Sequence, residues 1–194
     1  MRTQPDGELN ISASVSAYRE LLAAGADPRA WEPFGSSRHG ESVDVITDHT
    51  TTIARMNAGA LPYKIVVLSL TDPPEGDLQS GIEAFVRSGG AVVLSVEHLT
   101  QASALSLAGC RLSGRHSIAT STTWNGTQLS EATFNYSVVV PTTAQVVAVT
   151  ELGDPIVLRN GLGSSGGAVY TVTAQYMGAP RVGGAVLNTL SDSL

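Results

Sequence analysis

The sequence predicts a three-layer α/β sandwich, in which helices cover both faces of a mostly parallel sheet. Helix and strand patterns alternate along the first half of the 194 residues, and such alternation requires right-handed crossovers between parallel strands. Residues 63–70 and 91–96 are almost continuously apolar, as expected of strands buried on both faces. We expect a single domain over residues 1–194, because this length suits one hydrophobic core.

The expected elements of the first half end at glycines or prolines, which stop helices and strands. They are, in chain order, a helix from Ser14 or Ser16 to Gly25, a strand at 43–46, a short helix at 50–57, a strand at 63–70, a helix after Asp77, a strand at 91–96 and a helix at 98–108.

The helix after Asp77 has the clearest pattern. Asp77 is a suitable N-cap residue, and Gly89 and Gly90 end the helix. Four apolar residues recur at the helical spacing i, i+4, i+7 and i+8 and so form one apolar face: Leu78, Ile82, Phe85 and Val86.

The second half of the chain changes in character. Residues 112–150 are rich in Ser, Thr and Val with little helical period, and strands are expected only at 137–140 and 145–150. Segments 155–160 and 168–173 predict a hairpin, and a short helix is expected from residue 185 onward. We therefore expect antiparallel strands to be added to the parallel sheet in this half.

The glycines between the two hairpin strands, Gly161-x-Gly163-x-x-Gly166, formally match the dinucleotide-binding fingerprint. That function needs a helix N-terminus directly after the glycines to hold the pyrophosphate. The residues that follow, 168–172, have the pattern of a strand. A flexible hairpin turn is the preferred interpretation.

Polar residues follow three of the predicted parallel strands, and ligands of open α/β sheets bind at the carboxyl ends of strands. The candidate ligand crevice consists of Asp48, His49, Asp72, Ser95 and Glu97. Glu97 and His98 form a weak candidate catalytic pair, because a carboxylate beside an imidazole can perform acid–base or metal chemistry. The alternative is that these are ordinary loop residues, since loops begin where strands end.

Composition excludes several classes of protein. The formal net charge is −6 and no Lys/Arg cluster occurs, which argues against nucleic-acid binding. The apolar runs are too short for a membrane helix, and the N-terminus lacks the apolar region of a signal peptide. The sequons at Asn10, Asn125 and Asn135 are only a weak indication of a secreted origin.

A single cysteine, Cys110, excludes an internal disulfide and a cysteine-based zinc site. It follows a glycine that ends a predicted helix, whereas a reactive thiol needs a helix N-terminus or a neighbouring base. We interpret Cys110 as structural and expect neither a metal nor a cofactor.

Several segments resemble the class I glutamine-amidotransferase-like fold, in the non-catalytic form that accompanies β-galactosidase-type glycoside hydrolases. The resemblance covers about two thirds of the chain and rests on residues 43–46, 61–68, 82–94, 153–158 and 166–170. It implies a flavodoxin-like sandwich. That fold opens with a central strand, and only residues 9–11 offer one here.

The resemblance does not extend to the catalytic triad of the active amidotransferases. The region of the nucleophile, residues 95–98, lacks a cysteine, and no histidine follows His116. A nucleophile without its base cannot be activated.

The resemblance therefore implies a non-catalytic scaffold or accessory domain of a larger, glycoside-hydrolase-related protein. Its role would be oligomerisation or proximity to carbohydrate, and its partners would be other domains or subunits of the parent protein. Two alternatives stay open. One is a small hydrolase that uses Glu97 and His98; the other is an interaction scaffold of the kind found in gliding-motility and intraflagellar-transport proteins.

Overall fold

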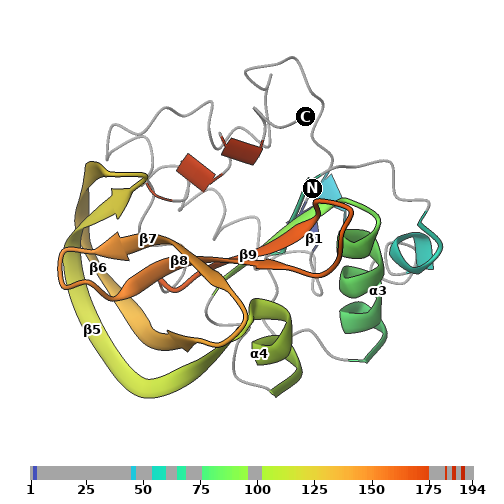
Figure 1. Ribbon diagram of the computed structural model, residues 1–194, viewed down its shortest axis with the longest axis horizontal. Helices are drawn as coiled ribbons and strands as arrows, with labels where there is room; N and C mark the ends of the chain where they lie inside the picture. The colour runs from blue at the N-terminus through green and yellow to red at the C-terminus, as the bar shows by residue number, and fades with distance from the viewer. Residues whose placement is uncertain are drawn as a thin grey trace.

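The computed structural model describes residues 2–3, 45–46, 54–59, 65–68, 76–95, 102–174, 182, 185–186 and 189–190. Within them, nine strands form one sheet in the order β2-β1-β3-β4-β9-β8-β7-β5-β6 (Figure 1). The strands are β1 (Arg2–Thr3), β2 (Val45–Ile46), β3 (Ile65–Leu68), β4 (Ala91–Ser95), β5 (Cys110–Trp124), β6 (Thr127–Pro141), β7 (Gln145–Thr150), β8 (Pro155–Gly161) and β9 (Ala168–Val172). The helices are α3 (Gly76–Arg87) and α4 (Ala102–Ala108).

The sheet is mixed, and the predicted mostly parallel, flavodoxin-like sandwich is wrong. Strands β2, β1, β3, β4 and β9 pair in parallel, whereas β9, β8, β7, β5 and β6 pair antiparallel. Far more of the described residues lie in strands than in helices. The error arose at residues 110–141, where the sequence indicated a strand at 137–140 and the structure has two strands of 15 residues each.

The parallel half agrees with the sequence patterns. Strand β4 is buried on both faces, since Val92 and Leu94 join one apolar cluster and Val93 joins another. Helix α3 buries Ile82, Phe85 and Val86, three members of its predicted apolar face. The helix begins at Gly76, so Asp77 lies in its first turn rather than before it. Residues 54–57 are helical as well, and Gly59 follows with a φ of 64°.

The opening strand lies earlier than the sequence suggested. Strand β1 lies between β2 and β3 and pairs in parallel with both. Residues 9–11, which were expected to supply this strand, and the helix expected from Ser14 or Ser16 to Gly25 lie outside the described residues.

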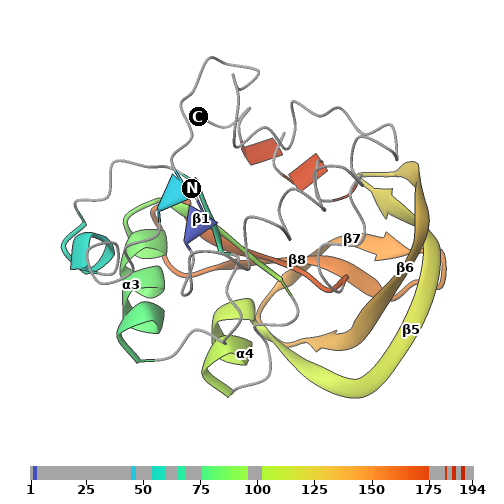
Figure 2. The same cartoon turned by 180° about the vertical axis from the view of Figure 1, so that it is seen from behind.

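The antiparallel half is dominated by the long β5–β6 hairpin, which curves around the opposite end of the molecule from α3 (Figures 1 and 2). Its turn, Asn125-Gly126, has positive φ at both residues, as a two-residue hairpin turn of type I′ requires. Farther along, Tyr136 of β6 forms a bridge with Ala174, just after β9. Strands β9, β8, β7, β5 and β6 therefore bend round toward a barrel.

A helical segment covers the interior of this half. Residues 182, 185–186 and 189–190 are helical, in agreement with the helix expected near the C-terminus. Val182, Val186 and Leu190, spaced four residues apart, are buried in the main apolar cluster with strands of the antiparallel half. The Glu131 carboxylate on β6 accepts the backbone N–H of Val182 at 2.8 Å. The carboxylate thereby satisfies the backbone N–H of a helical residue.

The junction between the two halves is built around Gly109, which ends α4 with a φ of 66°. Its carbonyl oxygen accepts backbone N–H groups from residues 142–144 at 2.8–3.1 Å. The buried Asn160 side chain donates to the Leu107 carbonyl at 2.8 Å and accepts from the Thr143 hydroxyl. Gly109 thereby joins the end of α4 to the β6–β7 turn, and Asn160 joins both of them to β8.

Candidate functional site

One group of polar side chains lies at the sheet edge where the sequence predicted a ligand crevice. Strand β8 runs antiparallel to β9, with Val157 opposite Val172, so β8 begins where β9 ends. The Thr173 hydroxyl donates to the Pro155 carbonyl at 3.0 Å. Asp154, immediately before β8, therefore lies at the carboxyl edge of the parallel strands, the edge at which α/β proteins bind ligands.

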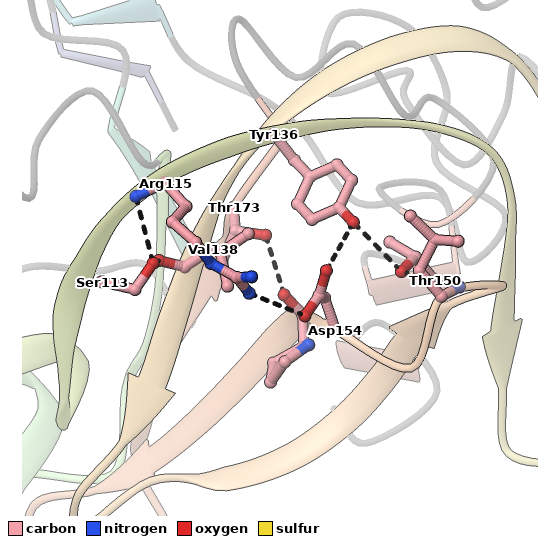
Figure 3. Close-up of polar contacts among 9 residues, drawn as sticks. Ser113, Arg115, Tyr136, Val138, Thr150, Asp154 and Thr173 are labelled. Atoms are coloured by element: carbon pink, nitrogen blue, oxygen red, sulfur yellow. Dashed lines mark hydrogen bonds and ion pairs between the residues drawn. The ribbon is translucent and has the colours of Figure 1, made fainter.

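Asp154 is hydrogen-bonded to a buried tyrosine (Figure 3). The Tyr136 hydroxyl donates to Asp154 Oδ2 at 2.7 Å and lies 3.5 Å from the Thr150 hydroxyl. The Tyr136 side chain is fully buried, and its ring lies 6.0 Å from that of Phe134. The contact thus ties the start of β8 to β6 at the position where β6 meets the end of β9.

Arg115 on β5 approaches the other oxygen of the same carboxylate. Its Nη2 lies 3.9 Å from Asp154 Oδ1, with the arginine side chain 70% exposed and the aspartate 23% exposed. A pair at this distance with a well-exposed arginine contributes little to stability. Ser113 holds the strand at this point, because its hydroxyl donates to the Val138 carbonyl and accepts the Arg115 N–H, where the β5–β6 register shifts.

A second carboxylate, Glu151, binds the backbone of β5. Its Oε1 accepts the N–H of Thr120 at 2.8 Å and its Oε2 accepts the N–H of Ser121 at 3.0 Å. A β-bulge lies at this position, and the carboxylate satisfies the N–H groups of two successive residues. Burial tends to raise the pKa of Glu151, but the hydrogen bonds from the backbone and the Thr120 hydroxyl outweigh it, and the net shift is downward.

The chemistry of the cluster is mainly structural. Both carboxylates are occupied by donors of their own chain, and Tyr136 is too deeply buried to present its ring to a ligand. His116 Nδ1 lies 3.2 Å from the Ser137 hydroxyl. Among the described residues no carboxylate is hydrogen-bonded to this ring, so the contact is a cross-strand pair rather than an activated nucleophile.

Of the residues predicted to form the ligand crevice, only Ser95 lies within the described part of the chain. Ser95 is the last residue of β4 and lies opposite Val172 of β9, at the same sheet edge as Asp154. The other candidates, Asp48, His49, Asp72, Glu97 and His98, lie outside the described residues. Sequence reasoning missed Asp154 and Tyr136. The available signal was the turn Gly153-Asp154-Pro155 directly before a strand, which places a carboxylate at a strand end.

The glycine-rich segment connects an antiparallel hairpin, β8–β9, as predicted. It packs against the C-terminal end of α3, where the Arg87 side chain donates to the Leu162 carbonyl at 2.8 Å and the Ser165 hydroxyl donates to the Val86 carbonyl at 3.4 Å. The C-terminal end of a helix carries partial negative charge. The glycines lead directly into strand β9, so no helix N-terminus follows them to hold a pyrophosphate.

Cys110 is buried and free, which agrees with a structural role. Burial raises the pKa of its thiol to about 11, so the reactive thiolate is scarce at neutral pH. Within the described part of the chain, no group of three His, Cys, Asp or Glu side chains has an arrangement suited to a metal ion. A search of the same residues found no helix long and apolar enough to cross a membrane.

The structure is a strand-rich domain whose mixed sheet has a parallel half with helices and an antiparallel half that bends toward a barrel. A polar cluster lies at the carboxyl edge of its parallel strands. No family model and no curated protein sequence matches this chain. Solved structures do match. A GH42 β-galactosidase, Gan42B from G. stearothermophilus, aligns with a TM-score of 0.64 and 17% identity over 99% of this chain and 29% of its own.

Two further structures show the range of the likeness. The β-galactosidase from Bacillus circulans sp. alkalophilus aligns with a TM-score of 0.61 and 15% identity, over 99% of this chain and 30% of its own. A ThuA-like protein from Bacteroides uniformis aligns with a TM-score of 0.55 and 9% identity, over 98% of this chain and 88% of its own. This chain spans about 30% of the length of the β-galactosidases. At these identities the likeness establishes a shared fold, which supports the predicted resemblance at that level.

Proposed function

We propose that this chain is a non-catalytic accessory domain of a glycoside-hydrolase-related protein, and that it acts as a scaffold through which copies of the protein associate. The observation that carries the proposal is the extent of the likeness: 99% of this chain aligns with less than a third of a β-galactosidase. The matched region is thus one part of a larger enzyme.

The polar cluster supports a scaffold rather than a catalyst. Asp154 and Glu151 are the acids of the polar cluster that the structure describes. Each of them holds a strand in place, Asp154 through Tyr136 and Glu151 through the backbone of β5. A general acid or base must keep its carboxyl group available to a substrate, and these two are engaged within the fold.

Light scattering after size-exclusion chromatography tests the scaffold role. We expect the purified chain to run as an oligomer whose mass falls on dilution, because association follows mass action. A monomer at every concentration would contradict the proposal.

Turnover of a chromogenic β-galactoside tests the absence of catalysis. We expect no hydrolysis above that of buffer. Hydrolysis that disappears in Glu97→Gln and His98→Ala variants would instead establish the small-hydrolase alternative.

A further inference from the structure

The dipeptide Asn-Gly occurs twice in this chain, at Asn125-Gly126 and at Asn160-Gly161. An asparagine followed by glycine is especially prone to spontaneous deamidation. Glycine has no Cβ to crowd its backbone nitrogen, which attacks the side-chain amide of the preceding residue. The structure places the two dipeptides in opposite surroundings, so the same chain contains a reactive site and its internal control.

The first dipeptide forms the tip of the long hairpin. Asn125 and Gly126 are the two turn residues between β5 and β6, with φ of 47° and 80°, and both are exposed. Such a turn pairs the residues on either side of it, here Trp124 and Thr127, and leaves its own two residues outside the ladder. Among the described residues, none is hydrogen-bonded to the Asn125 amide or to the Gly126 N–H. Both reacting groups are therefore open to water and free of internal partners.

The second dipeptide lies in the junction between the two halves of the sheet. Asn160 on β8 is only 4% exposed. Its Nδ2, the atom that deamidation would release, donates to the Leu107 carbonyl at 2.8 Å, and its Oδ1 accepts from the Thr143 hydroxyl at 3.1 Å. Gly161 is fixed in the β8–β9 ladder opposite Ala168. Reaction at this asparagine requires the junction to open first.

We propose that Asn125 is a site of spontaneous deamidation in the folded chain, whereas the fold protects Asn160. The Gly126 nitrogen forms a bond to Cγ of Asn125, the bond between Cγ and Nδ2 breaks, and ammonia leaves with the proton that Gly126 has lost. Water then opens the resulting cyclic succinimide at either of its carbonyl groups, which yields aspartate or isoaspartate. Water is the only co-reactant.

The two products affect the hairpin differently. Aspartate keeps the normal backbone and is accepted in a turn of this type, so it only adds a negative charge to a chain whose net charge is −6. Isoaspartate routes the backbone through the side chain and lengthens it. Because a two-residue turn fixes the register of its strands, isoaspartate should disturb the pairing of Trp124 with Thr127. Ageing of the protein is therefore expected to loosen the hairpin at its tip.

Peptide mapping by mass spectrometry tests the site. The wild-type chain is incubated with and without urea at mildly alkaline pH, where the attacking nitrogen loses its proton more readily. In the folded chain we expect Asn125 to deamidate at least about tenfold faster than Asn160, because a buried amide reacts only through local opening. In urea, where the fold protects neither residue, the two rates should agree within about threefold.

Asn125→Gly is the matched variant, since glycine accepts the positive φ of the turn and has no side-chain amide. The acidic fraction that forms on ageing, measured by ion-exchange chromatography, should fall by the amount that mapping assigns to residue 125. An unchanged acidic fraction, equal rates at the two asparagines of the folded chain, or reaction of Asn125 in urea alone would each overturn the proposal. None of these outcomes bears on the proposed scaffold function, because the reaction does not require association.

Discussion

The two halves of the sheet are stabilised in different ways. In the parallel half, β4 is buried on both faces, and α3 packs its apolar face against the cluster that includes Val92 and Leu94. In the antiparallel half, long strands bend through register shifts and are held by side chains that bind backbone groups, such as Ser113 and Glu151. Both halves bury apolar side chains, and in the second half directional hydrogen bonds to the backbone also set the shape of the strands.

This difference implies that the two halves respond differently to the same kind of substitution. An apolar core tolerates a change of shape when the volume is kept. A strand that depends on one hydroxyl or one carboxylate loses that contact completely when the group is removed. Matched substitutions in the two halves can therefore test the comparison.

The largest effect is expected at the junction of the two halves, in Gly109→Ala. A Cβ there would lie 2.6 Å from the Thr143 hydroxyl and 2.8 Å from the Ala144 nitrogen. Overpacking combined with an unfavourable positive φ should lower the free energy of unfolding by about 3 kcal/mol. Urea denaturation followed by circular dichroism measures the change.

Gly59→Ala is the matched control in the parallel half. Gly59 has nearly the same φ, 64°, and nothing lies within 4 Å of the added carbon. Only the backbone cost of about 1 kcal/mol is expected. Equal losses in the two variants would show that the crowding around Gly109 is relieved without cost.

A smaller effect is expected in Tyr136→Phe, which removes the hydrogen bond to Asp154 and leaves that carboxylate oxygen without its buried donor. The free energy of unfolding should fall by about 2 kcal/mol. Tyr170→Phe is the control, because Tyr170 accepts a 3.2 Å bond from the partly exposed Arg159, and its loss should cost about half as much. A larger loss in Tyr170→Phe would contradict the role assigned to Tyr136 in holding β6.

The smallest effect is expected in Glu151→Gln, about 1 kcal/mol at neutral pH, since the carboxylate is well exposed to solvent. The pKa of Glu151 is lowered in the folded chain from its ordinary value of 4.5. The stability it contributes is therefore fully present above pH 4.5 and is lost as the pH falls through the lower folded value. Thermal melts of wild type and variant should converge in acid.

Glu83→Gln is the control for replacing a carboxylate that binds a side chain instead of the backbone. Glu83 lies on α3 and accepts a 3.2 Å bond from Gln79 one helical turn away, and a glutamine can accept the same bond. We expect its melting temperature at neutral pH to match that of the wild type. A gap between Glu151→Gln and wild type that persists below the folded pKa would show that the charge of Glu151 is not what holds Thr120 and Ser121.

The parallel half was the more predictable because its signals are local. The spacing of Ile82, Phe85 and Val86 reports a helix face, and the run at residues 91–95 reports a buried strand. The glycines at 59, 89 and 109 marked where helices end, and each has positive φ.

The antiparallel half was harder to predict because its signals are split between distant residues. The β5–β6 hairpin alternates poorly, since its register shifts twice and a shift moves side chains to the other face. The contacts of Glu151 with Thr120 and of Tyr136 with Asp154 join residues far apart in sequence, and no spacing rule connects them. The turn Gly153-Asp154-Pro155 did place Asp154 at the start of a strand, but the edge of the sheet at which that strand begins depends on the pairing of β8 with β9.

Strand β9 has a consequence for the order in which the chain can fold during synthesis. It pairs in parallel with β4 on one side and antiparallel with β8 on the other. When β4 has emerged from the ribosome, the strand that pairs with one of its edges, β9, has not yet been synthesised, because β9 begins only at residue 168. Until then β4 exposes unpaired backbone groups, and contacts so distant in sequence form slowly. The nascent chain must therefore wait for its last described strand before either half is complete.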